Sequence, residues 1–375
     1  MTQDMSDDQT FEIFLTAPPG LEPVLAEEVR AAGFATPQTV PGGVTTQGGW
    51  PEVWRANLVL RGATRVLVRI GGFRAFHLAQ LDKRARKFEW GDFLRTDVPV
   101  KVETTTNRKS KIYHAGAATQ RIETALKDSH GITVADDAEL RLMARIDDNF
   151  VMFSLDTSGT SLHKRGHKEA VNKAPMRETL AALFLRQMGF DGTQPVLDPM
   201  CGSGTFVIEA AEMAAGLAPG RTRSFAFESL ASFDSAAWAQ MKAAQTSGTP
   251  PKQFFGSDRD AGAVRMSTAN AERAGVDGFT EFTNVAIADL QRPDCDPGIV
   301  IINPPYGARI SNKGPLFAVH AQMGEVLKER FAGWRVGIIT SEPQLAKATG
   351  LTFAKTSPPV PHGGLKVKLY QTGTL

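Results

Sequence analysis

Two short segments of the chain carry residue types that are suited to chemistry. The first has the sequence Asp-Pro-Met-Cys-Gly-Ser-Gly-Thr at residues 198–205, between an apolar strand pattern ending at Leu197 and a run with helical spacing from Phe206. Glycines in such a strand-to-helix turn allow positive φ angles and let a ligand approach the backbone closely. The segment lacks the Lys of a Walker loop and the third glycine of a dinucleotide fingerprint. Its Asp198 instead favours a cofactor that carries an ammonium group.

The second segment is Asn-Pro-Pro-Tyr at residues 303–306, which follows a strand pattern of four β-branched residues at 299–302. Proline cannot donate to a β-ladder and restricts the residue before it, so the strand must end abruptly here. A rigid turn at a strand end can present an amide oxygen, a backbone carbonyl and an aromatic face. These three groups together can hold a planar exocyclic amine.

Together the two segments resemble the class I S-adenosylmethionine-dependent methyltransferases that act on exocyclic or amide nitrogens. Residues 198–205 are most similar to the THUMP-domain family that makes N2-methylguanine in large-subunit (23S) ribosomal RNA, some members of which are described as N6-adenine-specific DNA methylases. The resemblance runs from Lys164 to the C-terminus and before that rests on the layout of elements.

The resemblance implies an α/β chain with three domains. Residues 1–72 would form a ferredoxin-like domain and residues 73–160 a THUMP-like RNA-binding domain. Residues 161–375 would form a Rossmann-like methyltransferase domain, in which a doubly wound, mostly parallel sheet ends in a hairpin. The strand and helix patterns of the N-terminal part fit this scheme, although those of the first 72 residues fit an unspecified α+β domain equally well.

S-adenosylmethionine is the cofactor that the resemblance implies, without a metal ion. Asp258 follows a strand pattern one strand–helix unit beyond the glycines, where a carboxylate can accept hydrogen bonds from ribose hydroxyls. Asp260 can at the same time cap the helix predicted at residues 261–274.

Two further segments are assigned to the cofactor by the resemblance. In the family, the Ala-Pro-Met segment that contains Pro175 lies against the methionine end of the cofactor, although it also fits a plain helix start. Many relatives have an acidic or polar residue where this chain has Ala286, which leaves Asp289 as the candidate for adenine. The predicted cofactor-binding residues are Pro175, Asp198, Pro199, Met200, Cys201, Gly202, Gly204, Thr205, Asp258, Arg259 and Asp289.

Methyl transfer from a sulfonium to an amine is mainly a task of placement. The Asn303 amide oxygen and the Pro304 carbonyl would accept hydrogen bonds from the amine, and Tyr306 would stack on the base. A base inside a duplex cannot reach such a pocket, so the target must be unpaired or flipped out, at a cost of roughly a few kcal/mol. The predicted catalytic residues are Asn303, Pro304, Pro305 and Tyr306.

Basic residues gather in three clusters, although the net charge is only +2. Any one cluster is adequately explained as a solvated surface. Three clusters within about a hundred residues favour contact with phosphates. The loop at residues 104–111 would face RNA. The predicted RNA-binding residues are Lys83, Arg84, Arg108, Lys109, Lys111, Lys164 and Arg165.

The bulk composition, with 42% hydrophobic and 22% charged residues, is that of a soluble globular protein. No apolar run is long enough to span a membrane, and the polar, acidic start is not typical of a signal peptide, so we expect a cytoplasmic protein. Two cysteines are too few for a disulfide framework, and Cys201 is interpreted as packing rather than as a nucleophile. We expect a monomer.

Several alternatives remain open on sequence. Asn-Pro-Pro-Tyr also suits adenine-N6 methylation of DNA and glutamine methylation of proteins, because each substrate presents a planar nitrogen. A DNA enzyme would carry a target-recognition segment, and none is evident in the sequence. A non-catalytic RNA-binding or ribosome assembly factor would be expected to have lost the glycine segment or Asn303, and both are intact. Because the chain ends at Leu375 without a second methyltransferase domain, we expect one modification rather than two.

Overall fold

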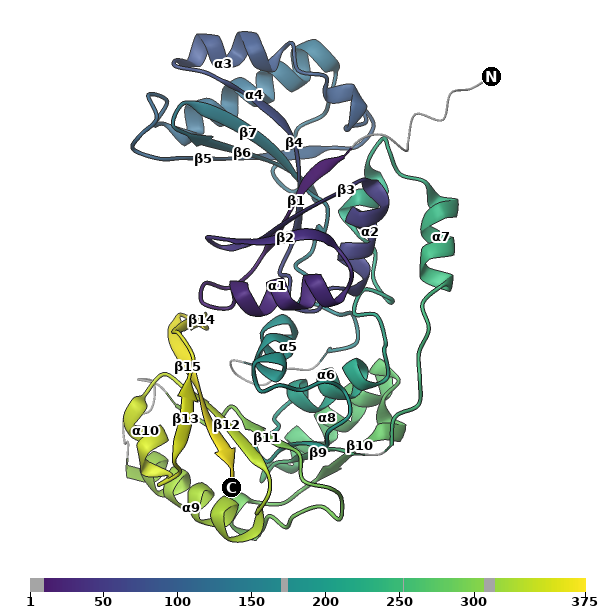
Figure 1. The fold of residues 1–375 in the computed structure, drawn as a ribbon. Helices are drawn as coiled ribbons and strands as arrows, with labels where there is room; N and C mark the ends of the chain where they lie inside the picture. The colour runs from purple at the N-terminus through teal and green to yellow at the C-terminus, as the bar shows by residue number, and fades with distance from the viewer. Residues whose placement is uncertain (1–9, 170–174, 252, 307–313) are drawn as a thin grey trace. The chain divides into compact units, whose positions relative to one another are not determined.

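The computed structural model describes residues 10–169, 175–251, 253–306 and 314–375 (Figure 1). By its internal contacts, the chain divides into two compact units, each with its own β-sheet. Unit 1 contains the chain up to Ala17, Ala26–Leu162 and Arg223–Ala244. Unit 2 contains Pro18–Leu25, His163–Thr222 and Gln245–Leu375.

Within the described residues, unit 1 is built on a seven-stranded sheet with the order β2-β3-β1-β4-β7-β6-β5. Neighbouring strands are antiparallel except β5 and β6, which are parallel. The strands are β1 Phe11–Thr16, β2 Ala35–Val40, β3 Gly43–Gly48, β4 Val66–Arg74, β5 Val100–Thr106, β6 Leu140–Asp147 and β7 Phe150–Asp156. The helices in this part of the chain are α1 Glu22–Ala31, α2 Trp50–Val59, α3 Leu78–Ala85, the 3-10 helix η1 Trp90–Asp92 and α4 Ala115–His130.

Strand β4 joins the two halves of this sheet, because it pairs with β1 on one side and with β7 on the other. The predicted domain boundary at 72/73 lies inside β4 and is therefore wrong. The strand continues through Gly71 and Gly72 to Arg74, although glycine weakens the interior of a strand. Asp148 and Asn149, in the turn between β6 and β7, have φ of 47° and 60°.

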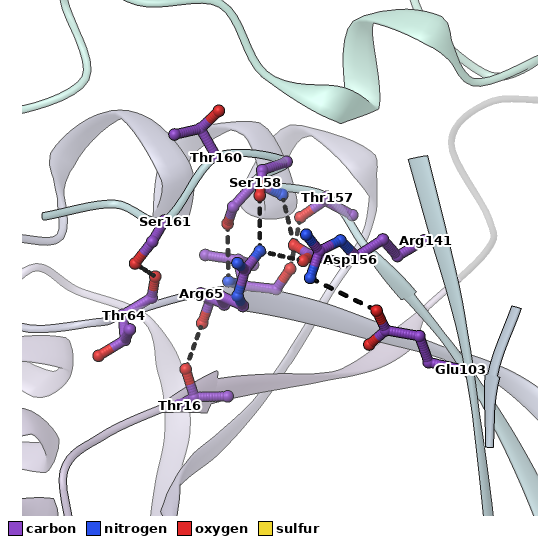
Figure 2. A network of polar contacts seen from close by, with 12 residues as sticks. Thr16, Thr64, Arg65, Glu103, Arg141, Asp156, Thr157, Ser158, Thr160 and Ser161 are labelled. Carbon is purple, nitrogen blue, oxygen red and sulfur yellow. Dashed lines mark hydrogen bonds and ion pairs between the residues drawn. The ribbon is translucent and has the colours of Figure 1, made fainter. Parts of the chain in front are cut away.

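A polar network lies where β4 and β7 meet, and Figure 2 shows how its side chains converge. Asp156 is 1% exposed and pairs with Arg65, while its Oδ1 accepts a hydrogen bond from the Ser158 N–H at 3.0 Å. The Arg65 guanidinium also donates to the Gly159 carbonyl at 2.6 Å. Ser158 donates in turn to the Asn57 side chain at 2.7 Å, which attaches α2 to the end of β7. The network thereby fixes the two halves of unit 1 to each other.

The segment Arg223–Ala244 leaves the fold of unit 2 and packs within unit 1. It contains the 3-10 helix η2 Ala226–Ser229 and the helix α7 Ser235–Ala243. Phe227 stacks on Trp54 with 6.1 Å between ring centroids and meets Trp238 edge-on at 5.1 Å. These ring contacts pack the segment against α2 within unit 1.

Unit 2 is built on a sheet with the order β10-β9-β8-β11-β12-β15-β13, with β14 pairing to β15 outside this path. The strands from β10 to β12 run parallel, whereas β15 is antiparallel to β12 and β13. This confirms the predicted doubly wound, mostly parallel sheet with a terminal hairpin. The strands are β8 Val196–Asp198, β9 Phe254–Ser257, β10 Thr280–Thr283, β11 Ile299–Ile302, β12 Arg335–Thr340, β13 Phe353–Thr356, β14 Val360–His362 and β15 Leu365–Thr374.

Helices alternate with the parallel strands of unit 2 along the chain, as a doubly wound fold requires (Figure 1). All four residues of β11 are fully buried, as their apolar sequence predicts. No helix within the described residues is long and apolar enough to cross a membrane. The helices are α5 Glu178–Gln187, α6 Thr205–Ala214, α8 Ala261–Ala274, η3 Asp277–Phe279, η4 Ile287–Asp289, α9 Gly314–Arg330 and α10 Pro343–Ala348.

Candidate active site

The glycine segment forms the turn between β8 and α6, as the sequence predicts. Gly202 and Gly204 have φ of 55° and 81°, which side-chain-bearing residues rarely adopt. A Cβ atom at Gly204 would also lie 2.9 Å from the Cβ of Ser267. The positive φ and the lack of room for a Cβ atom both require glycine at residue 204. The turn therefore exposes its backbone together with the first N–H groups of α6.

Asp198 ends β8 and has only 3% of its surface exposed. Its Oδ1 accepts a hydrogen bond from the Met200 N–H at 3.0 Å. Burial, with a smaller effect from the nearby Asp258 charge, raises the pKa of Asp198 to about 8. Because a buried carboxylate is stabilised by a cation, this position fits an ammonium group.

Asp258 follows β9 and connects that strand end to the glycine turn. One carboxylate oxygen accepts the Gly202 N–H at 3.0 Å, and the other accepts the Asp260 N–H at 2.9 Å. Each carboxylate oxygen has a second lone pair, so both remain able to accept from ribose hydroxyls. Asp260 caps α8 by accepting the Gly262 N–H at 2.8 Å, which confirms its predicted capping role. The neighbouring Arg259 is exposed.

The Cys201 thiol is buried within the turn, at 6% exposure. Burial raises its pKa well above the usual range, so the thiol stays protonated and unreactive. The interpretation of Cys201 as packing is thereby supported on physical grounds. Pro199 beside it is also buried, whereas Met200 is half-buried.

The loop that contains η4 is held by a cation that sequence reasoning missed. The Arg330 guanidinium donates to the carbonyls of Ala288 and Leu290 at 3.1 and 2.8 Å. Asp289 lies between these two residues with an exposed side chain. An arginine in the last turn of a predicted helix gives no sequence signal for such a contact.

The Asn-Pro-Pro-Tyr segment follows β11 directly, so the buried strand fixes its start. The Oδ1 atom of Asn303 is buried, and no residue in the described part of the chain donates a hydrogen bond to it. Pro304 is buried and Pro305 is exposed. Burial raises the pKa of Tyr306 to about 12, so its hydroxyl is neutral at any physiological pH. A buried amide oxygen without a donor costs about 1–3 kcal/mol, and a bound amine would relieve that cost.

The linker before α5 contains two basic residues that were predicted to bind RNA, and they differ in burial. Lys164 is exposed. Arg165 is 1% exposed, and its guanidinium lies 3.0 Å from Glu209, which is equally buried. The prediction that Arg165 contacts RNA is therefore wrong, because its charge is neutralised inside unit 2. Sequence could not distinguish it from its exposed neighbour, since the acidic partner lies on α6.

The other predicted RNA-binding residues belong to unit 1. Lys83 and Arg84 lie on the exposed side of α3, and Arg108, Lys109 and Lys111 lie in the loop between β5 and α4, where all three are exposed. Lys111 Nζ lies 5.5 Å from the ring centroid of Phe76, one of the few large hydrophobic side chains that the described surface exposes.

The segment that contains Pro175 and the start of α6 are joined by Lys168, a second residue that sequence reasoning did not assign to the site. Lys168 Nζ donates to the Met176 carbonyl at 3.1 Å and to Thr205 Oγ1 at 2.7 Å. It also lies 3.1 Å from Glu178 Oε1. Its position in a basic run favoured a surface role, and the burial of its acidic partner Glu178 could not be read from the sequence.

These features form a site that fits S-adenosylmethionine. The chain offers a buried carboxylate for an ammonium group at Asp198, a glycine turn that allows close approach, and a second carboxylate at Asp258. Within the described residues, no three side chains of His, Cys, Asp or Glu gather closely enough to hold a metal ion.

Comparison with known proteins agrees with this site. Residues 165–368 match the methyltransferase domain described as RMKL-like, and residues 12–67 match the RlmL ferredoxin-like domain. The "Ribosomal RNA large subunit methyltransferase K/L" of Syntrophotalea carbinolica is 34% identical over 368 residues, covering 93% of this chain and 52% of that protein. The chain thus spans about half the length of this relative.

Two further proteins match over nearly their whole length. The "Putative RNA methyltransferase slr0064" of Synechocystis sp. is 30% identical, with 95% of both chains covered. The crystal structure of "SMU.472, a putative methyltransferase complexed with SAH" superposes with a TM-score of 0.87 at 27% identity, covering 98% of this chain and 99% of that one. SAH is S-adenosylhomocysteine, the form that S-adenosylmethionine takes after methyl transfer. The chain therefore belongs to the RMKL-like methyltransferase family.

Proposed function

We propose that this chain transfers a methyl group from S-adenosylmethionine to the exocyclic N2 amine of a guanine in large-subunit ribosomal RNA. When bound, the cofactor supplies a methyl carbon that already carries a good leaving group. The chain has to place the amine lone pair in line with that carbon and to exclude other geometries. Such an enzyme would act in the cytoplasm on ribosomal RNA or its precursor particle.

The observation that carries this proposal is the buried Oδ1 of Asn303, which no described residue satisfies. An amine N–H can supply the missing donor, and the Pro304 carbonyl can accept a second hydrogen bond. Both acceptors would stabilise the positive charge that grows on nitrogen during transfer. Tyr306 would stack on the base, and its raised pKa keeps the hydroxyl neutral.

An RNA substrate is supported by the charge of unit 1 and by the names of the relatives. Lys83, Arg84, Arg108, Lys109 and Lys111 are exposed cations that can contact phosphates, and Lys164 adds one in unit 2. In this proposal, the part of unit 1 beyond the ferredoxin-like segment is a THUMP-like domain that binds RNA.

The cofactor residues are proposed in the same way. Asp198 would hold the ammonium group, Asp258 the ribose hydroxyls, and Asp289 the adenine. Pro199, Met200, Cys201, Gly202, Gly204 and Thr205 would shape the turn around the methionine end, with Pro175 on its other side and Arg259 beside Asp258.

The Asn303→Ala variant tests the amine grip. Removal of Oδ1 should lower the single-turnover rate on RNA at least a hundredfold, because loss of one preorganised hydrogen-bonding group that stabilises developing charge costs about 10²–10³ in rate. Affinity for S-adenosylhomocysteine should stay within about twofold, since Asn303 is assigned to the acceptor rather than to the cofactor. A variant that turns over near the wild-type rate would refute the grip.

A further inference from the structure

The Lys168 ammonium group has three polar partners among the described residues. An ammonium group has three N–H donors. Lys168 Nζ donates to the Met176 carbonyl at 3.1 Å and to Thr205 Oγ1 at 2.7 Å, and it forms an ion pair with Glu178 Oε1 at 3.1 Å. One side chain therefore joins the segment before α5, the first residue of α5 and the first residue of α6.

Among the described residues, those around Lys168 leave little space for a ligand. The side chains of Lys168 and Glu178 are only 10% and 8% exposed. The cavity beside them, which Ser203, Thr205 and Ile208 also line, has a volume of about 10 Å³. That is roughly the volume required for one water molecule. Lys168 thus connects protein segments rather than binding an anion. We call its contacts with Met176, Thr205 and Glu178 the bracket.

The bracket connects two segments that are assigned to the same part of the cofactor. Thr205 directly follows the glycine turn, and its hydroxyl lies 3.4 Å from the Met176 carbonyl as well as accepting from Lys168. Met176 directly follows Pro175 and is 4% exposed. The spacing between the glycine turn and the Pro175 segment is therefore set by these hydrogen bonds.

We propose that Lys168 is a positioning residue for the methionine end of S-adenosylmethionine, acting through Met176 and Thr205 without touching a reacting atom. The proposal rests on the cofactor placement given under the proposed function. It requires that loss of the bracket loosens only the pocket for the methionine end. The adenine and ribose positions, which involve Asp258 and Asp289, do not depend on the bracket.

A comparison of two ligands tests this. S-adenosylhomocysteine carries the methionine end, whereas 5′-methylthioadenosine keeps the adenine, ribose and sulfur but lacks the amino-acid part. For Lys168→Met, calorimetry should show affinity for S-adenosylhomocysteine about tenfold lower, because hydrogen bonds from a charged group are removed. Affinity for 5′-methylthioadenosine should be unchanged. Lys168→Arg, which keeps the charge, should recover part of the affinity.

Because Lys168→Met leaves the buried Glu178 without its cation, the double variant Lys168→Met/Glu178→Gln restores charge balance while still lacking the bracket. It should show the same selective weakening as Lys168→Met. Lys347→Met is the matched control, since Lys347 is exposed in the last turn of α10.

Equal weakening of both ligands in a folded variant, or unchanged affinity for S-adenosylhomocysteine, would overturn the proposal. Neither binding assay contains a methyl acceptor, so failure of the proposed RNA substrate would leave this result unaffected.

Discussion

Cofactor binding should release a proton from Asp198. In the free protein, burial raises the pKa of this carboxyl to about 8, so at pH 7 only about one tenth of the molecules carry the charge that an ammonium group needs. At pH 7, ionising the protonated Asp198 carboxyl costs about 1.4 kcal/mol, because its pKa lies about one unit above the pH. Affinity for S-adenosylhomocysteine should therefore rise about tenfold from pH 6 to pH 7 and become level above pH 8.

Calorimetry in buffers of different ionisation enthalpy measures this directly. At pH 7 we expect about 0.9 protons released for each S-adenosylhomocysteine bound, since nearly all sites must ionise. Asp258 and Cys201 are the titratable neighbours, and the Cys201 pKa is raised well above this range. Affinity that changes less than about twofold between pH 6 and pH 8, without proton release, would refute the assignment of the ammonium group to Asp198.

The stability of the free protein provides a second test of the raised Asp198 pKa. The folded-state pKa of Asp198 lies above the unfolded value of 3.8, so between pH 4 and pH 8 the folded protein holds a proton that the unfolded chain has lost. The contribution of Asp198 to the free energy of unfolding must therefore fall as the pH rises through this window. Asp198→Asn should flatten that decline and raise the Tm of the free protein at pH 8, while weakening cofactor binding.

Four further variants separate catalysis, folding and RNA binding. Tyr306→Phe should keep the wild-type turnover and pH profile, because a hydroxyl with a pKa of about 12 stays neutral. Tyr306→Ala should lower the single-turnover rate at least about tenfold, because the base no longer stacks on the ring. Arg165→Met should lower the free energy of unfolding by about 3–5 kcal/mol in denaturant titrations, since it breaks the buried ion pair with Glu209, and should leave RNA affinity unchanged. The double variant Lys109→Ala/Lys111→Ala should bind RNA more weakly, and its log–log salt slope should shrink by about 0.7 for each phosphate that the protein no longer neutralises; an unchanged slope would exclude these lysines from the interface.

Local patterns were sufficient to predict the elements that position the site. The apolar residues before Asp198 and Asn303 form the buried strands β8 and β11, and the glycines between β8 and α6 form the expected turn. These segments are predictable because each one satisfies its own burial and backbone requirements within a few residues. Strand β2 was not predicted, because it exposes most of its residues and shows no apolar alternation.

Long-range pairing accounts for what sequence could not predict. Arg165 and Lys168 belong to one basic run, yet each is buried against an acidic partner on a helix, Glu209 and Glu178 respectively. The carbonyls held by Arg330 are likewise distant in sequence. Partners of this kind depend on tertiary packing, which periodicity and spacing do not encode.

The central claim is tested most directly by the identity of the methylated nucleoside. The protein is incubated with labelled S-adenosylmethionine and protein-free large-subunit ribosomal RNA from a strain that lacks this gene, with duplex DNA in parallel, and the products are digested to nucleosides. The account predicts that the label appears in N2-methylguanosine from the RNA and not in the DNA. Label in N6-methyladenine of the DNA, or in any RNA nucleoside other than N2-methylguanosine, would contradict it.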